Sequence, residues 1–508
     1  MLNEIYGPLK SGTDIRGTAV EGVPGEEITL TDEVIKNIGY GFAVWLADNI
    51  LPQGDEYTVA IGHDSRVSAE RVKSAFVEAL LESGVNIKDC GLASTPAMFM
   101  TTVDFECDAA VEITASHHPF NKNGLKFFTK KGGLESGDIE QILTNAQYDL
   151  KVEGVGERPH GTLTQCTYMN NYAALLREKI CKEVNADNYS RPLSGFKIVV
   201  DAGNGVGGFY ATKVLEPLGA DITGSQFLDP DGMFPNHVPN PENKVAMSYI
   251  SSAVKLNGAD LGIIFDTDVD RAACVAKDGR EINRNALIAL AACIALEGNE
   301  GGTIVTDSVT SSGLKDFIEK ELGGKHHRFK RGYKNVINES KRLNYEECVN
   351  SPLAIETSGH AAMRENYFLD DGAYLITKIV IKAAVLAKEG KTLDSLIENL
   401  VEPAVAEEYR VKILASDFKS YGKKVIEDLE AAMRANPDYV VANDSFEGIR
   451  ATKTSAQGWF LLRLSVHDPI LPINIESNIT EGLAPILADV KNFLSQYEEL
   501  DISSLNKE

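Results

Sequence analysis

The chain of 508 residues is too long for a single hydrophobic core, and we expect three or four domains. Its composition, 43% hydrophobic and 24% charged, is typical of a soluble globular protein. A formal net charge of −24 argues against a nucleic-acid partner, because binding to a phosphate backbone needs a basic surface. An anionic substrate would therefore need cations gathered locally around its site.

Cysteine usage and hydropathy indicate the cellular compartment of the protein. The seven cysteines are scattered without Cys-x-x-Cys spacing, which indicates reduced thiols rather than a zinc ribbon or a disulfide framework. The N-terminus lacks the basic flank and apolar core of a secretory signal. The longest apolar run, residues 286–296, is shorter than the roughly 20 residues that span a bilayer, so we expect a buried helix there. We predict a cytoplasmic protein without a membrane partner.

The first predicted domain, residues 1–155, opens with Gly12-Thr-Asp-Ile-Arg-Gly17. Arg16 is a candidate phosphate ligand because a guanidinium grips two phosphate oxygens at once; an exposed salt bridge is the alternative. Apolar periodicity then predicts a strand at residues 57–61, a turn at 62–66, a helix at 69–83 and the start of a second strand at 84–88. His63 and Arg66 lie in the turn, where such residues are usually structural.

A serine-containing loop follows the next predicted strand, residues 108–114. Residues 114–128 read Thr-Ala-Ser-His-His-Pro-Phe-Asn-Lys-Asn-Gly-Leu-Lys-Phe-Phe, so the strand delivers Ser116 into a turn with His117 beside it and Lys126 beyond. A serine beside imidazole and ammonium groups could be a nucleophile, because a free hydroxyl is weak and needs a neighbouring base and charge. The alternative is a hydrophilic turn whose side chains satisfy backbone groups.

The second predicted domain, residues 156–282, follows a Gly-, Glu- and Pro-bearing linker at residues 151–160. Its first expected elements are a helix at residues 168–180, a strand at 195–200, a glycine-rich turn at 201–208 and a second helix at 209–218. The turn has the spacing Gly-x-Gly-x-Gly rather than Gly-x-Gly-x-x-Gly, so no dinucleotide site is predicted.

An acidic loop directly follows the apolar strand predicted at residues 261–265. Three carboxylates at alternate positions on a tight loop can point at one hard cation, which relieves their mutual repulsion. The three are Asp266, Asp268 and Asp270. An EF-hand would need glycine and glutamate where Arg271 and Lys277 stand, so a calcium loop is excluded and magnesium completed by a phosphate fits better. A solvated acidic turn is the alternative.

These two loops together resemble the α-D-phosphohexomutase family, the phosphoglucomutase and phosphomannomutase enzymes. The family's phosphoserine loop is similar to Thr-Ala-Ser-His-Asn-Pro followed by Asn-Gly-x-Lys, and its metal loop to Asp-x-Asp-x-Asp-Arg. Both occur here in family order, with His118 where asparagine is usual. The segment Ile355-Glu-Thr-Ser-Gly-His360 resembles the family's sugar-binding loop, and the resemblance covers most of the chain.

The third predicted domain, residues 283–400, repeats the strand, turn and helix pattern. We expect a strand at residues 302–307, a helix at 311–322 and a strand end that enters a loop at 329–334. A later helix is expected to end near residue 391. Lys334 resembles the family's phosphate- or sugar-contacting lysine; a surface cation is the alternative. Glu356, Ser358 and His360 share one turn, where donors and acceptors suit sugar hydroxyls, and the histidine could assist proton transfer.

The fourth predicted domain, residues 401–508, alternates between strands and helices in an α+β pattern. Strands are expected at residues 408–413, 447–452 and 458–465, and helices at 417–434 and 484–497. The family places a phosphate-binding loop of the type Arg-x-Ser-Asn/Gly-Thr-Glu/Thr-Pro here, and this chain has Arg463-Leu-Ser-Val-His-Asp-Pro469. Arg463 and Ser465 match the family pattern, whereas Val466, His467 and Asp468 do not.

The resemblance implies three related α/β domains and a smaller C-terminal α+β domain around a central cleft. It also implies a Mg²⁺-dependent shift of a phosphoryl group between O1 and O6 of glucose or mannose, through a phosphoserine and a 1,6-bisphosphate. The implied roles are catalytic for Ser116, Lys126, Arg16, His117 and His360, substrate-binding for Lys334, Glu356, Ser358, His360, Arg463, Ser465 and Arg271, and metal-binding for Ser116, Asp266, Asp268 and Asp270.

This function has three alternatives. A phosphoglucosamine mutase has similar serine and Ser-Gly-His loops. A non-catalytic sugar-phosphate sensor is a second alternative, although binding alone does not need a phosphorylatable Ser116. A hydrolase of the alkaline phosphatase kind would need paired zinc sites, for which the His and Asp spacing is wrong. The expected ligands are hexose mono- and bisphosphates, and the expected state is a monomer or homodimer.

Overall fold

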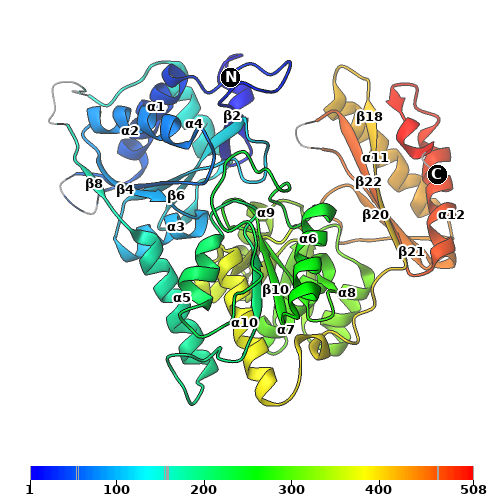
Figure 1. The fold of residues 1–508 in the computed structure, drawn as a ribbon. Coiled ribbons are helices and arrows are strands. Elements are labelled where there is room, and N and C mark those ends of the chain that lie inside the picture. The colour runs from blue at the N-terminus through cyan, green and yellow to red at the C-terminus, as the bar shows by residue number, and fades with distance from the viewer. Residues whose placement is uncertain are drawn as a thin grey trace. The chain divides into compact units, whose positions relative to one another are not determined.

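The chain forms two compact units. The computed structural model describes residues 2–52, 54, 56–153, 155, 160–465 and 468–506. The first unit comprises Met1–Leu287 and Ser358–Ser395, and the second comprises Ile288–Thr357 and Leu396–Glu508 (Figure 1). The predicted linker at residues 151–160 lies in part outside the described residues. The four predicted domain boundaries and the central cleft stay predictions.

The first unit contains an eight-stranded mixed sheet with the order β1-β2-β6-β5-β3-β4-β8, and β7 pairs with β6. The strands are β1 (Lys10–Ser11), β2 (Asp14–Thr18), β3 (Thr58–His63), β4 (Asn86–Leu92), β5 (Ala109–Ile113), β6 (Lys122–Thr129), β7 (Gly132–Gly133) and β8 (Leu163–Gln165). The helices around this sheet are α1 (Asp32–Asn49), α2 (Ala69–Glu82), α3 (Thr95–Asp104) and α4 (Ser136–Gln147). Helices α1, α2 and α4 cover one face, and α3 lies on the other (Figure 1).

Apolar alternation builds the core beneath helix α1. Thr31 caps this helix by accepting a hydrogen bond from the Val34 backbone N–H at 3.3 Å. The Phe42 ring packs 4.9 Å from the Phe127 ring of β6, centroid to centroid. Since side chains alternate along a strand, the residues on either side of Phe127 face α3 instead.

A second sheet of the first unit has the order β12-β11-β10-β9, and only its β9–β10 pair is parallel. Its strands are β9 (Ile198–Asp201), β10 (Leu261–Phe265), β11 (Ala272–Ala276) and β12 (Glu281–Ile282). The accompanying elements are α5 (Tyr168–Val184), the π-helix η2 (Tyr210–Leu215), α6 (Lys244–Asn257), α10 (Gly372–Lys388) and the antiparallel pair β16 (Ala361–Met363) and β17 (Leu369–Asp370). Helix α7 (Arg284–Leu296) begins in the first unit and continues in the second.

The second unit has two groups of strands. Parallel strands β14 (Lys325–Phe329) and β15 (Leu353–Ile355) flank β13 (Thr303–Asp307), with α8 (Ser312–Asp316), the π-helix η3 (Phe317–Glu321) and α9 (Tyr333–Tyr345). An antiparallel sheet has the order β19-β20-β21-β22-β18-β23. Its elements are β18 (Val405–Ile413), α11 (Phe418–Ala435), β19 (Tyr439–Val441), β20 (Ile449–Lys453), β21 (Gly458–Leu462), β22 (Ile470–Ser477), α12 (Leu483–Leu494) and β23 (Leu500–Asp501).

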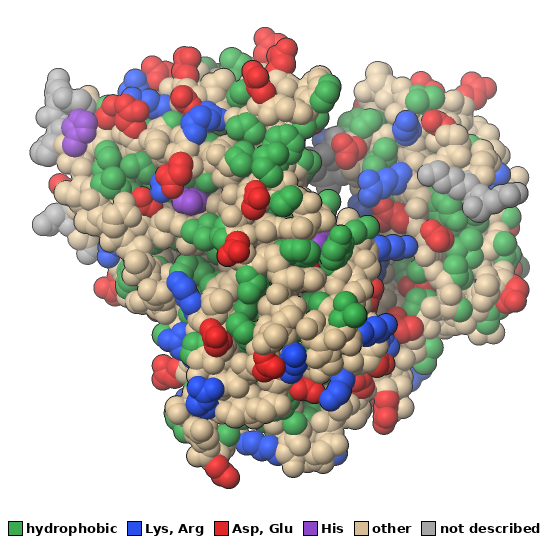
Figure 2. Space-filling view, in the orientation of Figure 1, with side chains coloured by type: hydrophobic (Ala, Val, Ile, Leu, Met, Phe, Trp, Pro, Cys, Tyr) green, Lys and Arg blue, Asp and Glu red, His purple; other side chains and the backbone are tan. Residues whose placement is uncertain are grey.

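The predicted α/β class is confirmed, and the buried helix expected at residues 286–296 is present as α7. Two details differ. The helices expected at residues 209–218 and 311–322 are partly π-helical, and Lys334 lies in the first turn of α9 rather than in a loop. No helix in the described part of the chain is long and apolar enough to cross a bilayer. Acidic and basic side chains are interspersed on the face shown in Figure 2.

A buried ion pair braces the glycine-rich turn after β9. The Nε2 atom of His237 lies 3.0 Å from Asp201 Oδ1, and its Nδ1 atom lies 2.9 Å from the carbonyl oxygen of Val238. Both ring nitrogens therefore face acceptors, which favours the imidazolium. Burial opposes the charge, but Asp201 outweighs it and raises the pKa of His237.

We predict that His237→Gln destabilises the protein most at low pH. A raised pKa means that the ion pair contributes its full stability below the ordinary histidine pKa of about 6.5 and loses it as the pH rises through the raised value. Removing a hydrogen bond between charged groups should cost about 1.5–3 kcal/mol at pH 5.5. Urea unfolding across the pH range measures this loss. A loss that does not shrink above pH 7 would contradict a charged His237.

Candidate active site

The serine loop begins where β5 ends. Ser116 is buried and has a φ of 51°, a left-handed conformation that is uncommon for any residue except glycine. Its backbone N–H donates to the Thr114 hydroxyl at 2.9 Å, which holds this conformation. Strained backbone of this kind is concentrated at functional sites, because the surrounding structure must maintain it.

A single buried guanidinium, that of Arg66, organises the whole serine loop. Its Nε atom lies 3.2 Å from Asp64 Oδ2, and its two Nη atoms donate to four backbone carbonyls of the loop. The acceptors are the carbonyl oxygens of Ser116, His118, Pro119 and Lys122, the last three at 2.7, 2.7 and 2.9 Å. The planar fork of donors suits this task in a way that a lysine ammonium does not. Arg66 is therefore structural, as the sequence predicts, but it acts directly on the serine loop.

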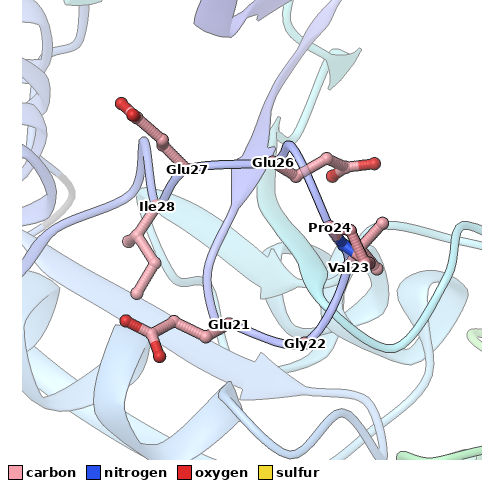
Figure 3. Close-up of a pocket in the computed structure, with 7 residues that line it drawn as sticks. All are labelled: Glu21, Gly22, Val23, Pro24, Glu26, Glu27 and Ile28. Carbon is pink, nitrogen blue, oxygen red and sulfur yellow. The ribbon is translucent and has the colours of Figure 1, made fainter.

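A separate loop braces the serine loop from outside. Figure 3 shows a hollow in the loop between β2 and α1, which is lined by residues 21–24 and 26–28. Its Glu26 carboxylate pairs with Lys122 and accepts from Asn121 Nδ2 at 2.9 Å. This hollow holds no part of the predicted site.

Three aspartates converge directly after β10. Asp266, Asp268 and Asp270 are fully or almost fully buried, and one carboxylate oxygen from each lies within 4.8 Å of the other two. One oxygen each of Asp268 and Asp270 has no hydrogen-bond partner among the described residues. Buried oxygens rarely remain without a partner. This donor set could hold a metal ion.

Lys126 and Arg271 supply the positive charge beside the aspartates. The Nζ atom of Lys126 lies 2.7 Å from Asp268 Oδ2 and 2.5 Å from Asp270 Oδ2. Arg271 Nε donates to Asp266 Oδ2 at 3.1 Å. Burial raises the pKa of Asp266, and the Asp270 carboxylate adds to the rise. For Asp270, the lysine ammonium and other cations outweigh burial and lower the pKa.

Close backbone contacts fix the aspartate loop. A Cβ atom on Gly205 would lie 2.5 Å from the Thr267 carbonyl oxygen, and one on Gly372 would lie 2.7 Å from the Arg271 carbonyl carbon. Only glycine permits these approaches without movement. Within the loop, Val269 has a φ of 67°, an outlier for a β-branched residue. The glycine-rich turn at residues 201–208 thus packs against the aspartate loop.

The structure brings the serine and the aspartates together. The Ser116 hydroxyl donates to Asp266 Oδ2 at 3.2 Å and accepts from Arg271 Nη2 at 2.9 Å. Helix α3 reaches the same cluster, because the Thr95 backbone N–H donates to the Asp268 carbonyl at 2.9 Å and its hydroxyl donates to the Asp268 carboxylate. One hydroxyl therefore lies beside a carboxylate cluster and a guanidinium.

Two predicted histidines have opposite protonation preferences. Burial lowers the pKa of His117 to about 2, helped by the Arg271 guanidinium, whose Nη2 atom lies 2.6 Å from His117 Nδ1. His117 is therefore neutral. The Nδ1 atom of His360 lies 2.6 Å from Asp370 Oδ2. Burial opposes its charge, but the carboxylates of Asp370 and Asp270 raise the pKa of His360 to about 9, so it is a cation at neutral pH.

The remaining predicted site residues are distributed over both units. Arg16, in the first unit, pairs with Asp14 at 2.7 Å, and its charge contributes to the lowered pKa of His118. Ser358 is buried and also belongs to the first unit. Lys334, Glu356, Arg463 and Ser465 belong to the second unit.

Contacts within the second unit hold two of these residues. Glu356 accepts from the Gly332 backbone N–H at 2.6 Å, and the Ser465 hydroxyl accepts from the Asp468 backbone N–H at 3.2 Å. Residues 466 and 467 of the atypical loop lie outside the described residues.

Sequence reasoning assigned no role to two residues that the site contains. Thr95 follows a serine and precedes a proline, a combination typical of a helix start, but nothing in that pattern points to an aspartate some 170 positions away. Asp370 stands next to Asp371, and only its contact with His360 identifies it. Asp370, His360 and Asp270 form a second group of potential metal-binding side chains.

Comparison with known proteins places the chain among sugar-phosphate mutases. Models of phosphoglucomutase/phosphomannomutase α/β/α domains I, II and III match residues 10–149, 170–279 and 283–404. A phosphomannomutase/phosphoglucomutase of Pseudomonas syringae is 29% identical over 484 residues, 94% of each protein. A phosphoglucomutase/phosphomannomutase of Thermococcus kodakarensis is 31% identical over 91% of this chain and 94% of its own.

A solved structure of a phosphoglucomutase/phosphomannomutase family protein from Burkholderia thailandensis is also similar. It superposes with a TM-score of 0.78 at 25% identity and covers 98% of both chains. The likeness therefore extends over nearly the whole length.

We predict that Gly205→Ala displaces the aspartate loop. The added methyl group would overlap the Thr267 backbone, and overpacking of this kind costs about 1–3 kcal/mol. Urea unfolding measures the stability. Gly137→Ala is the matched control, because a Cβ atom there meets nothing within 4 Å and should leave the free energy of unfolding unchanged or slightly raised. Equal effects of the two substitutions would contradict the close-approach argument.

We predict that Arg66→Met loosens the serine loop and destabilises the protein by about 3–5 kcal/mol, because Asp64 is left buried without its guanidinium. Arg66→Lys should not restore stability, since one ammonium cannot reach four carbonyls. Denaturant unfolding and amide exchange of loop residues measure both effects. Arg434→Met, which removes a surface pair with Glu430, is the control and should cost much less. Unchanged exchange in the loop would contradict the role of Arg66.

Proposed function

This chain belongs to the phosphoglucomutase/phosphomannomutase family, and we propose that it interconverts hexose 1-phosphate and hexose 6-phosphate through a phosphorylated Ser116. The observation that carries this proposal is the place of the Ser116 hydroxyl, 3.2 Å from Asp266 Oδ2 and 2.9 Å from Arg271 Nη2. A hydroxyl that carries a phosphoryl group needs such a setting, with cations for the phosphoryl oxygens and a site for a metal.

Magnesium is the metal that we propose for the three aspartates. Carboxylate oxygens are its preferred ligands, and it usually keeps positions for phosphate oxygens, such as those of a phosphorylated Ser116. When bound, it would withdraw charge from the phosphoryl group and make the serine oxygen a better leaving group. The oxygens of Asp268 and Asp270 for which the described residues provide no hydrogen-bond partner support this assignment.

The proposed transfer breaks the bond between phosphorus and the Ser116 oxygen as a sugar hydroxyl forms a bond to phosphorus. Arg271 already donates to the Ser116 oxygen and would stabilise the charge that develops on it. Lys126 and Arg16 would stabilise the transferring group as cations, and the proton of the attacking sugar hydroxyl would pass to the Ser116 oxygen as it leaves. Neutral His117 would accept or donate a hydrogen bond without adding charge. His360, a cation at neutral pH, would supply a proton to a sugar oxygen.

We propose that the second unit supplies specificity. Within this unit, Lys334 and Glu356 offer donors and acceptors that suit sugar hydroxyls. Ser358 and His360, which belong to the first unit, have the same chemical character and the same proposed role. Arg463 and Ser465 would bind the phosphate that does not react, since a guanidinium holds two phosphate oxygens. Burial lowers the pKa of Arg463, and Glu447 opposes this effect. The preferred hexose, a cytoplasmic location and a monomeric or dimeric state stay predictions.

We predict that the enzyme converts glucose 1-phosphate and mannose 1-phosphate in a coupled assay, and that Ser116→Ala lowers kcat at least about a thousandfold because the phosphoryl carrier is lost. Ser251→Ala is the matched control, because the Ser251 hydroxyl has no hydrogen-bond partner among the described residues and lies on α6. Glucosamine 1-phosphate tests the alternative mutase. Turnover of the amino sugar alone would select that enzyme, and binding without turnover would select a sensor.

A further inference from the structure

Glu112 is an anomaly in the middle of β5. Its neighbours in the strand are Ala, Val and Ile, yet this glutamate has no exposed surface. Neither carboxylate oxygen has a hydrogen-bond partner within the part of the chain that the structure describes. Burying a polar group without a partner costs several kcal/mol, and a carboxylate costs more. A glutamate at this position therefore needs a function that the isolated fold does not supply.

The backbone places Glu112 directly opposite Lys126. The two residues are paired across the antiparallel strands β5 and β6. Val111 and Leu125 belong to the core beneath α1, so alternation puts Glu112 and Lys126 together on the opposite face. Directly paired side chains have Cβ atoms about 4.5–5.5 Å apart, within reach of an ammonium and a carboxylate.

Gly62 of β3 makes room for this carboxylate. It is the parallel partner of Glu112, and a Cβ atom on Gly62 would lie 2.8 Å from Glu112 Oε2. Burial raises the pKa of Glu112 well above its ordinary value, the carboxylates of Asp64 and Asp268 add to the rise, and Lys126 opposes it. The carboxyl group thus sits in a fitted space beside an ammonium that it does not bind.

Lys126 is instead bound to the aspartates that the metal would occupy. Its Nζ atom contacts Asp268 Oδ2 at 2.7 Å and Asp270 Oδ2 at 2.5 Å. An ammonium and a dication on the same oxygens repel each other, and a buried charge without a partner is costly. A metal on these oxygens would therefore displace the Lys126 ammonium, and a further carboxylate within reach would stabilise it there. Asp64 is already engaged, since it accepts from Thr114 Oγ1 at 2.7 Å and pairs with Arg66.

We propose that Glu112 is the second partner of Lys126: when a divalent cation binds the aspartate loop, the Lys126 ammonium exchanges Asp268 and Asp270 for the Glu112 carboxylate. This inference rests on the metal site of the proposed function. Glu112 is a positioning residue, because it would hold the lysine at the transferring phosphoryl group without touching the substrate. In the metal-free protein it destabilises the fold, and in the metal-bound protein it completes the charge balance.

The test compares metal affinity with metal-free stability in Glu112→Gln and Glu112→Met. Titration calorimetry with Mg²⁺ should show that the dissociation constant rises about tenfold in both variants, because each variant loses the charge pair between residue 112 and Lys126. Without metal, Glu112→Met should raise the unfolding midpoint by about 2 °C or more, because an unpaired carboxyl is replaced by an apolar group. A residue with a merely structural role would not combine weaker binding with greater stability.

Two further comparisons serve as controls. Glu476→Gln changes a buried glutamate of the second unit that has its own partner, Trp459 Nε1 at 3.0 Å, and should leave Mg²⁺ affinity unchanged. In a Lys126→Met background, Glu112→Gln should no longer weaken Mg²⁺ binding, because the exchanged ammonium is absent.

The outcomes separate this inference from the proposed function. A wild-type protein that binds no Mg²⁺ would overturn the metal site itself. Wild-type binding with unchanged affinity in both Glu112 variants would overturn the exchange alone, as would a tenfold loss that persists without Lys126. Failure of both Glu112 variants to fold would assign the residue a structural role and would likewise overturn it.

Discussion

Three buried aspartates on one short loop impose the constraint on which the site depends. Their carboxylates lie close enough to repel strongly, and each would be costly to bury alone. Lys126 and Arg271 supply the compensating charge, and the guanidinium extends the same network to the Ser116 hydroxyl. The position of the serine therefore follows from electrostatic compensation as much as from the strand that carries it.

The same constraint explains how an acidic protein binds an anionic substrate. The formal net charge of −24 repels phosphates at long range, where salt screens it, whereas buried cations act at short range with little screening. Arg16 and Arg271 both contribute to the lowered pKa of His117, which shows how positive the surroundings of the serine loop are. The proposed phosphoserine would meet a locally cationic environment.

Rigid backbone contacts hold this arrangement in place. The Arg66 guanidinium donates hydrogen bonds to carbonyl oxygens of the serine loop and so holds that loop in place. Gly205 has no side chain, so the glycine-rich turn packs closely against the aspartate loop. Ser116 and Val269 both have positive φ angles, one in each loop. Strain in two loops that face each other is consistent with a site that is organised before a ligand arrives. The exchange proposed for Glu112 would then require movement of one lysine side chain alone.

The sequence by itself determined the two loops and their chemistry. Both loops are recognised from local patterns, because each is an apolar strand followed either by alternating aspartates or by a serine with histidines. Strand periodicity also predicted the strand Leu261–Phe265 with the bounds that are observed. Only the tertiary structure decided which distant groups meet there. Strand order and register decide these contacts, and no local pattern encodes either. The examples are the hydrogen bond from Thr95 to Asp268, the hydrogen bonds from Arg66 to the serine loop, and the pairing of Glu112 with Lys126. Contacts between residues far apart in the chain arise from packing, and packing is decided by the whole core at once.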